Sequence, residues 1–262
     1  MKTLALITDF GNQDYFIGVM KGVACSIDPE IQVIDLANEI PSFNIAAASF
    51  VLEKNVRYFP KGTVFLVVVD PGVGTERGIL LAQYDGYYFI GPDNGVLTPV
   101  LKKDEAKVWK IIKNRFFLHE GPSTFEARDK MTPVAAHLLK GVDIRHLAMP
   151  TSEFIVNSDY VPQRKGDAIV GQVVYIDKFG NCITNISKNF LFLHLSSGDF
   201  RKFDVYVAGS HISRFLETYG RGSSDPFMVI GSHQNLEIAV KEGSAAEVLG
   251  ITAGQKLVVN FE

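Results

Sequence analysis

Two aspartates stand at positions where an acidic side chain can do chemistry, each directly after an apolar run of strand character. Asp9 follows the run 4–8, and Asp70 follows the nearly continuous apolar run 63–69. In open parallel sheets, ligands bind beyond the carboxyl ends of the strands, where such a side chain has a rigid base. A carboxylate there can accept two hydroxyl hydrogen bonds, as a ribose diol requires. The spacing therefore indicates a ligand site, and the plainer alternative is that each aspartate caps a turn or a helix.

The loop 70–78 is the most unusual stretch of the chain. It contains three glycines, which let the backbone approach a ligand closely. Its Gly-Val-Gly run at 72–74 has part of a nucleotide-binding pattern, but a strand follows it, so no helix N-terminus is placed to bind phosphate. Asp70 and Arg77 can pair across the loop, either within a site or as a salt bridge that only stabilises the loop.

A second polar cluster, 123–129, ends a loop and opens a helical pattern. Ser123 or Thr124 can cap this helix, and Glu126 then matches the acid of a capping box if Ser123 is the cap. This interpretation gives Glu126 a purely structural role.

Other catalytic motifs are missing from the sequence. The six histidines have no HxH, HxxxH or HExxH spacing, so no metal site is expected. No Walker motif and no GxSxG nucleophile elbow occur, which argues against P-loop enzymes and hydrolases with an activated serine. The net charge of −3 argues against nucleic acid as a partner, because proteins that bind polyanions are usually basic.

The sequence predicts a cytoplasmic protein. Its two cysteines, Cys25 and Cys182, lie far apart and suit a reducing compartment. No run reaches the roughly 20 apolar residues that a membrane span needs. The short apolar N-terminus meets Asp9 at once, so we interpret it as a first strand rather than a signal peptide.

The helices and strands that position these residues follow a different pattern in each half of the chain. In the first half, strands alternate with helices. Strands are expected at 4–8, 32–36 and 63–69, and helices at 14–27, 45–58 and 126–140. A hairpin is expected at 79–90, turned at Asp85-Gly86. This order predicts an α/β domain over residues 1–150, with a mainly parallel sheet flanked by helices.

The second half has short strands with no long helix between them. Residues 151–166 lack a clear period, and we interpret them as a linker. Strands are expected at 168–176, 182–186, 203–207, 227–230, 236–240 and 256–261. The pattern is typical of a small antiparallel barrel or sandwich, here over residues 167–262.

Several segments, in order along nearly the whole chain, carry a resemblance to a known family. They read TDFG at 8–11, VDPGVG at 69–74 with Arg77, PDNG at 92–95, STF at 123–125 with Arg128-Asp129, DKFGN at 177–181, and LEIA at 236–239. This set resembles the S-adenosyl-L-methionine hydroxide adenosyltransferases, which are relatives of the fluorinase and the chlorinase. The resemblance implies an N-terminal α/β domain and a smaller C-terminal antiparallel β-barrel domain. It also implies a homotrimer, with each substrate bound between the first domain of one subunit and the second domain of its neighbour.

The chemistry that the resemblance implies is displacement at the ribose 5′ carbon of S-adenosyl-L-methionine, with L-methionine as the leaving group. With water as the nucleophile, the products are adenosine and L-methionine. The sulfonium is already a good leaving group, so neither a metal nor a cofactor is expected. The protein must align the nucleophile, exclude bulk water and hold the ribose.

By match to the family, the substrate-binding residues divide among three parts of the substrate. They are Asp9, Thr124 and Phe125 for the ribose and the reacting carbon, Asp177 and Ser232 for the amino acid end of methionine, and Phe179, Asn181 and Tyr219 for adenine.

The catalytic set that the family implies is Asp, Arg and His, and this chain departs from it at one position. Asp70 and Arg77 match the first two residues. Glu126 stands in place of the histidine, and Ala127 in place of the following glycine. A carboxylate can take a proton from water, so we expect Glu126 to act as the base.

Three alternatives remain open at this point. If Glu126 only starts a helix, the chain is a protein that binds S-adenosyl-L-methionine or adenosine with weakened catalysis. A halogenase of the same fold is less favoured, because Glu126 would repel a halide and Ala127 lacks the serine hydroxyl that donates to fluoride in the fluorinase. An unrelated nucleoside hydrolase would act at the glycosidic bond and release adenine.

Overall fold

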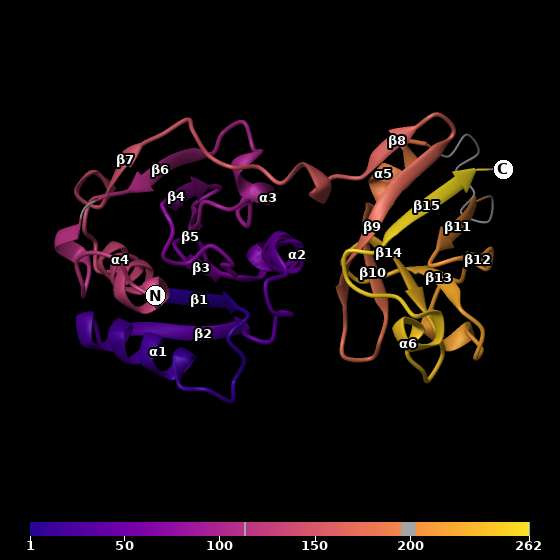
Figure 1. The fold of residues 1–262 in the computed structure, drawn as a ribbon, viewed down its shortest axis with the longest axis horizontal. Helices are drawn as coiled ribbons and strands as arrows, with labels where there is room; N and C mark the ends of the chain where they lie inside the picture. Colours follow the sequence, from indigo (N-terminus) through magenta and orange to yellow (C-terminus); the bar gives the residue numbers. More distant parts are fainter. Residues whose placement is uncertain (113, 195–202, 262) are drawn as a thin grey trace. The chain divides into compact units, whose positions relative to one another are not determined.

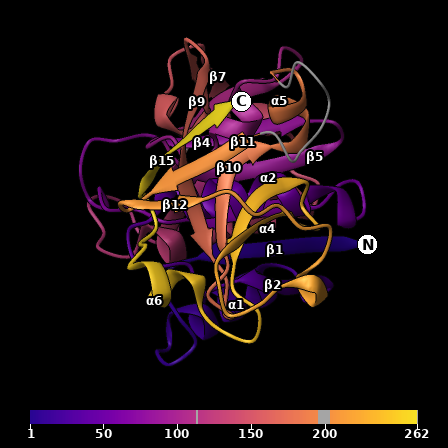
Figure 2. The ribbon, with the colours of Figure 1, turned by 90° about the vertical axis from the view of Figure 1, so that its right-hand side faces the viewer.

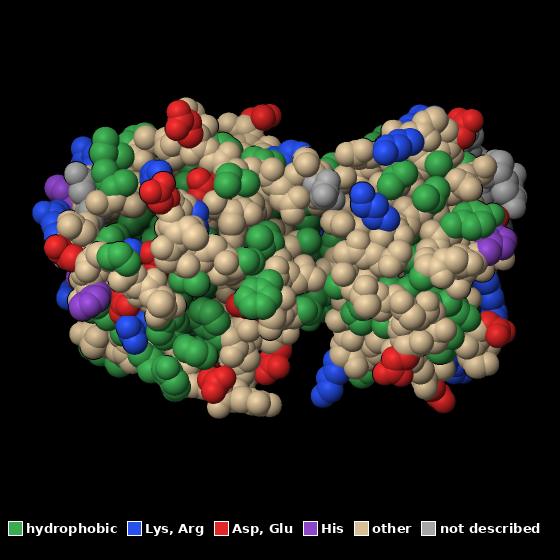
Figure 3. All heavy atoms as spheres, in the orientation of Figure 1, with side chains coloured by type: hydrophobic (Ala, Val, Ile, Leu, Met, Phe, Trp, Pro, Cys, Tyr) green, Lys and Arg blue, Asp and Glu red, His purple; other side chains and the backbone are tan. Residues whose placement is uncertain are grey.

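The computed structural model describes residues 1–112, 114–194 and 203–261. The chain divides into two compact units, Met1–Asn157 and Ser158–Glu262. The first is α/β and the second is antiparallel β, which confirms the predicted fold class (Figure 1). Basic and acidic side chains are interspersed on the surface shown in Figure 3. Within the described ranges, no helix has the length and apolar character needed to cross a membrane.

A mixed sheet with the strand order β2-β1-β3-β5-β4-β6-β7 forms the centre of the first unit. Its strands are β1 (Lys2–Thr8), β2 (Ile31–Ala37), β3 (Val64–Val68), β4 (Ile79–Tyr84), β5 (Tyr87–Pro92), β6 (Lys107–Ile111) and β7 (Ala148–Pro150). The pairings β1–β2, β1–β3 and β3–β5 are parallel, while β4, β6 and β7 extend the sheet in antiparallel fashion. We did not predict β6 and β7, because β6 is short and partly polar and β7 has only three residues.

Both faces of this sheet are buried at its central strands, β1, β3 and β5. Its helices are α1 (Phe16–Ile27), α2 (Ile45–Asn55), α3 (Thr98–Leu101) and α4 (Thr132–Leu139). All residues of β3 are buried, as expected for a strand that is covered on both sides. The face that carries Leu4, Leu6 and Leu66 packs against α1 and α4. The helix α2 is capped by Asn44, whose side chain accepts a hydrogen bond from the Ala47 N–H at 2.9 Å.

One helix departs from the sequence prediction. The predicted helix 126–140 begins with a π-helical segment, Ala127–Met131, and continues as α4. Pro133 has no N–H to bond the Asp129 carbonyl, and the Leu118 N–H donates to that carbonyl instead, at 2.8 Å. Such π segments often lie at functional sites, and this one begins directly after Glu126.

The second unit is an antiparallel sheet with the order β12-β11-β15-β9-β10-β14-β13, and β8 pairs with β9. Its strands are β8 (Gln163–Lys165), β9 (Ala168–Ile176), β10 (Cys182–Ser187), β11 (Phe203–Val207), β12 (Ser210–Ile212), β13 (Phe227–Ile230), β14 (Asn235–Ala239) and β15 (Lys256–Phe261), with the short helices α5 (Lys188–Phe192) and α6 (Ala245–Leu249). The sheet is nearly closed and barrel-like, around a core that includes Val173, Phe203 and Ile238. The strands β9, β11, β12 and β15 can be followed in Figure 2.

The boundary between the two units falls between Asn157 and Ser158, inside the stretch that we interpreted as a linker. Before the boundary, the Ile155 and Asn157 N–H groups donate to the Asp93 and Thr98 side chains at 2.7 and 2.8 Å. After the boundary, β8 forms a strand that we did not predict, because its three residues are all polar.

Candidate active site

A cleft of about 400 Å³ lies in the first unit where β1 and β3 end, and we call it the aspartate cleft. It is lined by Asp9, Phe10, Phe16, Ser42, Phe43, Val68, Asp70, Val73, Thr124, Phe125, Glu126 and Ala127. Its volume is in the range of small-molecule sites. All residues predicted for the site in this unit line the cleft except Arg77. Arg77 donates hydrogen bonds to two residues that do, Asp70 and Glu126.

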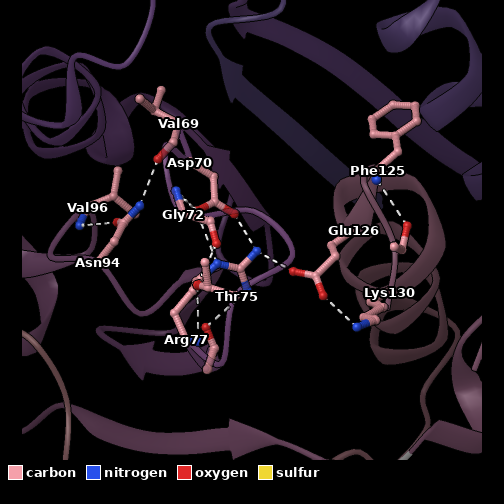
Figure 4. A network of polar contacts seen from close by, with 12 residues as sticks. Val69, Asp70, Gly72, Thr75, Arg77, Asn94, Val96, Phe125, Glu126 and Lys130 are labelled. Carbon is pink, nitrogen blue, oxygen red and sulfur yellow. Dashed lines mark hydrogen bonds and ion pairs between the residues drawn. The ribbon is translucent and has the colours of Figure 1, made fainter. Parts of the chain in front are cut away.

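Asp70 is held at the end of β3 by hydrogen bonds within its own loop (Figure 4). The Gly72 N–H donates to Oδ1 of Asp70 at 3.2 Å. The Thr75 hydroxyl donates to the Gly72 carbonyl at 2.7 Å and closes the turn. Just before the aspartate, the Asn94 amide donates to the Val69 carbonyl at 2.9 Å. The backbone on both sides of Asp70 is therefore fixed.

Arg77 joins two carboxylates that are distant in the sequence. Its Nε donates to Oδ1 of Asp70 at 3.0 Å, and its Nη2 donates to Oδ2, which is the two-point geometry that arginine makes with a carboxylate. The same Nη2 donates to Oε2 of Glu126, so the guanidinium lies between the two acids in Figure 4. The side chains of Arg77, Asp70 and Glu126 are 9%, 5% and 6% exposed. Because the three side chains are buried, breaking either ion pair would leave a buried charge without a partner. This cost holds Asp70, Arg77 and Glu126 in their present positions.

Glu126 is buried and is not used as a helix cap. Its Oε1 accepts a hydrogen bond from Nζ of Lys130 at 2.5 Å. The Ser123 hydroxyl accepts from the Phe125 N–H at 3.0 Å and donates to Asp129 at 2.5 Å. The structure therefore does not show the capping box that the sequence allows. Sequence reasoning missed Lys130, although its place four residues after Glu126 on a helical pattern is a usable signal.

Asp9 supplies a further carboxylate at the end of β1. Its Oδ2 accepts a hydrogen bond from the Phe43 N–H at 2.8 Å. Burial raises the pKa of the Asp9 carboxyl, and the nearby Asp70 charge acts in the same direction. A carboxylate has about four acceptor sites, so Asp9 keeps the capacity to bind a pair of hydroxyl groups.

Three phenylalanines form an aromatic wall in the aspartate cleft. The ring of Phe125 lies 5.7 Å from that of Phe10 and 5.2 Å from that of Phe16, measured between centroids, and both pairs meet edge to face. Such a wall offers apolar surface to a ligand and keeps bulk water from its reacting atoms.

The predicted site residues of the second unit lie, with one exception, at a cleft of about 740 Å³, which we call the barrel cleft. It is lined by Asp177, Phe179, Asn181, Tyr219, Gly220, Val240, Lys241, Glu242, Gly243 and Ser244. Oδ1 of Asp177 accepts from the Phe179 and Asn181 N–H groups, both at 2.9 Å, and Oδ2 accepts from the Asn181 amide at 2.8 Å. The exception is Ser232, which is exposed in the turn after β13 and is not among the lining residues.

Sequence reasoning also missed Glu237 beside the barrel cleft. Glu237 is buried on β14, and its Oε2 accepts a hydrogen bond from the Tyr219 hydroxyl. Burial raises the pKa of Glu237, and burial together with the Glu237 charge raises the pKa of Tyr219. The available signal was an acidic residue within an otherwise apolar strand, because a buried carboxylate needs a partner.

Other nucleophiles and metal ligands have little support in the structure. Both cysteines are free, and burial raises the pKa of the Cys182 thiol to about 12, which leaves it protonated at neutral pH. Over the described residues, no group of three or more His, Cys, Asp or Glu side chains is placed to hold a metal ion.

Known proteins with similar sequences identify the family. Residues 4–148 match the SAM hydroxide adenosyltransferase N-terminal domain, and residues 171–258 match the C-terminal domain. The chain is 32% identical to the (R)-S-adenosyl-L-methionine hydrolase of Thermus thermophilus, over 97% of this chain and 98% of that protein. It is 31% identical to the protein of the same name from Methanocaldococcus jannaschii, over 95% of this chain and 92% of that protein. Among solved structures, an uncharacterized conserved protein from Thermotoga maritima matches with a TM-score of 0.87 and 32% identity, over 98% of this chain and 99% of that one. Because both domain models match in order and together span most of the sequence, the chain belongs to the S-adenosyl-L-methionine hydroxide adenosyltransferase family.

Proposed function

We propose that this protein is an enzyme that cleaves S-adenosyl-L-methionine with water at the ribose 5′ carbon and yields adenosine and L-methionine. The observation that carries the proposal is the buried group of Asp70, Arg77 and Glu126 at a cleft that also holds Asp9. The names of the two relatives from Thermus and Methanocaldococcus support the same reaction.

In the proposed reaction, a water oxygen forms a bond to the 5′ carbon from the side opposite the sulfur. The carbon–sulfur bond breaks, and its electron pair stays on sulfur, which becomes the neutral thioether of methionine. The water becomes the 5′ hydroxyl of adenosine, and its other proton must go to a base. The sulfonium leaves without help, so the proposal needs neither a metal nor a cofactor.

Glu126 is better placed than Asp70 to be that base. Counting donors among the described residues, Asp70 accepts three hydrogen bonds, one from Gly72 and two from Arg77. Glu126 accepts two, from Arg77 and Lys130. A carboxylate has about four acceptor sites, so Glu126 keeps more capacity to take a proton from water.

The remaining predicted roles belong to the same proposal. Asp9 holds the ribose hydroxyls, and Thr124 and Phe125 line the reacting carbon. The second domain supplies Phe179, Asn181 and Tyr219 for adenine and Asp177 and Ser232 for methionine, with Ser232 the least supported because it lies outside the barrel-cleft lining.

We also propose a cytoplasmic homotrimer in which each substrate lies between the first domain of one subunit and the second domain of its neighbour. The two free cysteines support a reducing compartment. The net charge of −3 supports a small-molecule substrate and no nucleic-acid partner.

A second candidate function is binding without efficient turnover. It is favoured by the two ion pairs of Glu126, which are compatible with a purely structural carboxylate. A halogenase has less support, because Glu126 places negative charge at the cleft and the buried Ala127 has no hydroxyl to offer a halide.

The test is product analysis after incubation of the purified protein with S-adenosyl-L-methionine. Both epimers at sulfur should be supplied separately, because the relatives are named for the (R) form. We expect adenosine and L-methionine from the wild type and a loss of about 10²-fold or more in kcat for Glu126→Gln. Bound adenosine without turnover would favour the binding protein, and free adenine would contradict cleavage at the 5′ carbon.

A further inference from the structure

We propose that Lys130 is a positioning residue for this reaction. It holds the Glu126 carboxylate in place and offsets its charge from a third cleft. This proposal rests on the proposed hydrolysis. The family resemblance gives Lys130 no role in the site.

Lys130 meets Glu126 from the side away from Arg77. Its Nζ lies 2.5 Å from Oε1 of Glu126, whereas Arg77 bonds Oε2. Figure 4 shows the carboxylate between the two cations. With a different cation on each oxygen, the Glu126 side chain cannot rotate without losing an ion pair. Lys130 therefore helps to fix the direction of the remaining acceptor sites of the carboxylate.

The third cleft, which we call the lysine cleft, is lined in part by the side chain of Lys130. It has a volume of about 410 Å³, and its lining includes Glu76, Phe117, Glu126 and Lys130. Glu126 also lines the aspartate cleft, so its side chain lies between the two. Nζ of Lys130 lies 5.9 Å from the centroid of the Phe117 ring, within the range of a cation–π contact. The lysine is thus held by Phe117 as well as by Glu126.

The charges of the group balance only when Lys130 is included. Asp70 and Glu126 are acids, and Arg77 and Lys130 are bases, joined in one row by their ion pairs. Without Lys130, the buried row would carry a net negative charge, which a poorly solvated site tolerates badly. Lys130 therefore offsets the charge that Glu126 adds beside Asp70.

The consequence for the reaction is an effect on kcat rather than on binding. Glu126 acts on the water, while the substrate is held by other side chains. A base that is displaced by about 1 Å can cost up to about 10²-fold in rate. We therefore expect Lys130→Met to lower kcat by about 10- to 100-fold and to leave KM within about threefold. Lys130→Arg keeps the charge and should recover most of the lost kcat.

The matched control is Lys54→Met on α2. The Lys54 side chain is 16% exposed against 15% for Lys130, and it also pairs with a glutamate, Glu53, at 3.6 Å. It lies outside the lining of all three clefts. This change removes the same charge at the same depth, and we expect it to leave kcat unchanged.

A double-mutant cycle tests whether Lys130 acts through Glu126. Steady-state kinetics should be measured for Lys130→Met, Glu126→Gln and the combined variant. In the Glu126→Gln background, Lys130→Met should have little further effect on kcat, because the residue that it positions is already inactive. If Lys130→Met alone folds poorly, Lys130→Gln takes its place in the cycle, because it also removes the charge but leaves a polar donor beside Glu126.

Three outcomes decide between the role of Lys130 and the proposed hydrolysis. If the wild type produces adenosine but Lys130→Met and the control keep the wild-type kcat, the inference about Lys130 is wrong and the proposed hydrolysis survives. An equal loss of kcat from Lys130→Met in both backgrounds would also overturn it. If the wild type produces no adenosine, both proposals fall.

Discussion

Replacing Arg77 with methionine should destabilise the first unit by about 3–5 kcal/mol, the usual cost of breaking a buried ion pair from one side. Arg77 bonds both Asp70 and Glu126, and all three side chains are at most 9% exposed. The variant would leave the buried Asp70 carboxylate without its ion-pair partner and Glu126 paired with Lys130 alone. A surface salt bridge would cost less than about 1 kcal/mol, so the magnitude distinguishes the two situations.

Urea unfolding followed by tryptophan fluorescence measures this effect in the right unit. The chain has a single tryptophan, Trp109, which lies on β6. The control is Arg145→Met, because Arg145 pairs with Asp143 at 2.7 Å but the two side chains are 86% and 43% exposed. We expect the control to leave the urea midpoint nearly unchanged, because exposed ion pairs contribute little to stability. A similarly small change for Arg77→Met would refute the claim that its ion pairs are buried and stabilising.

Further predictions concern the aspartate cleft and the barrel cleft. Asp9→Asn should weaken adenosine binding yet raise the melting temperature at neutral pH, because burial raises the pKa of Asp9 and so disfavours its charge in the folded state. The gain should vanish as the pH falls below the ordinary carboxyl range, and calorimetry at neutral pH and at about pH 3 checks this sign. Tyr219→Phe should cost about 1–3 kcal/mol, since it removes a hydrogen bond to the buried carboxylate of Glu237. That bond favours the ionised form, so the loss in unfolding free energy should shrink as the pH falls through the raised pKa of Glu237. Gly180→Ala should cost about 1–2 kcal/mol in thermal unfolding and should weaken adenosine binding, because Gly180 has a φ of +81° and a methyl group there would collide with Ser244.

The parts of the site that local sequence patterns could predict are the ones attached to strand ends. The apolar runs before Asp9 and Asp70 make buried parallel strands, and the carboxyl ends of such strands meet at one edge of the sheet. The pairing of Asp70 with Arg77 could be predicted as well, because one short loop joins the two residues.

The parts that escaped prediction depend on contacts between distant segments. In the π-helical start at Ala127, the Asp129 carbonyl accepts from the Leu118 N–H, and Leu118 precedes the predicted helix. The burial of Glu237 depends on Tyr219, which lies on a different segment of the second unit. No local period in the sequence carries these pairings.

The central claim is that water attacks the ribose 5′ carbon with Glu126 as the base. Its most direct test is turnover of S-adenosyl-L-methionine in water enriched with oxygen-18, with mass spectrometry of both products, for the wild type and Glu126→Gln. The account predicts adenosine with one oxygen-18 atom at the 5′ hydroxyl, unlabelled L-methionine, and a loss of about 10²-fold or more in the variant. Unlabelled adenosine, release of adenine, or equal turnover by the two proteins would contradict it.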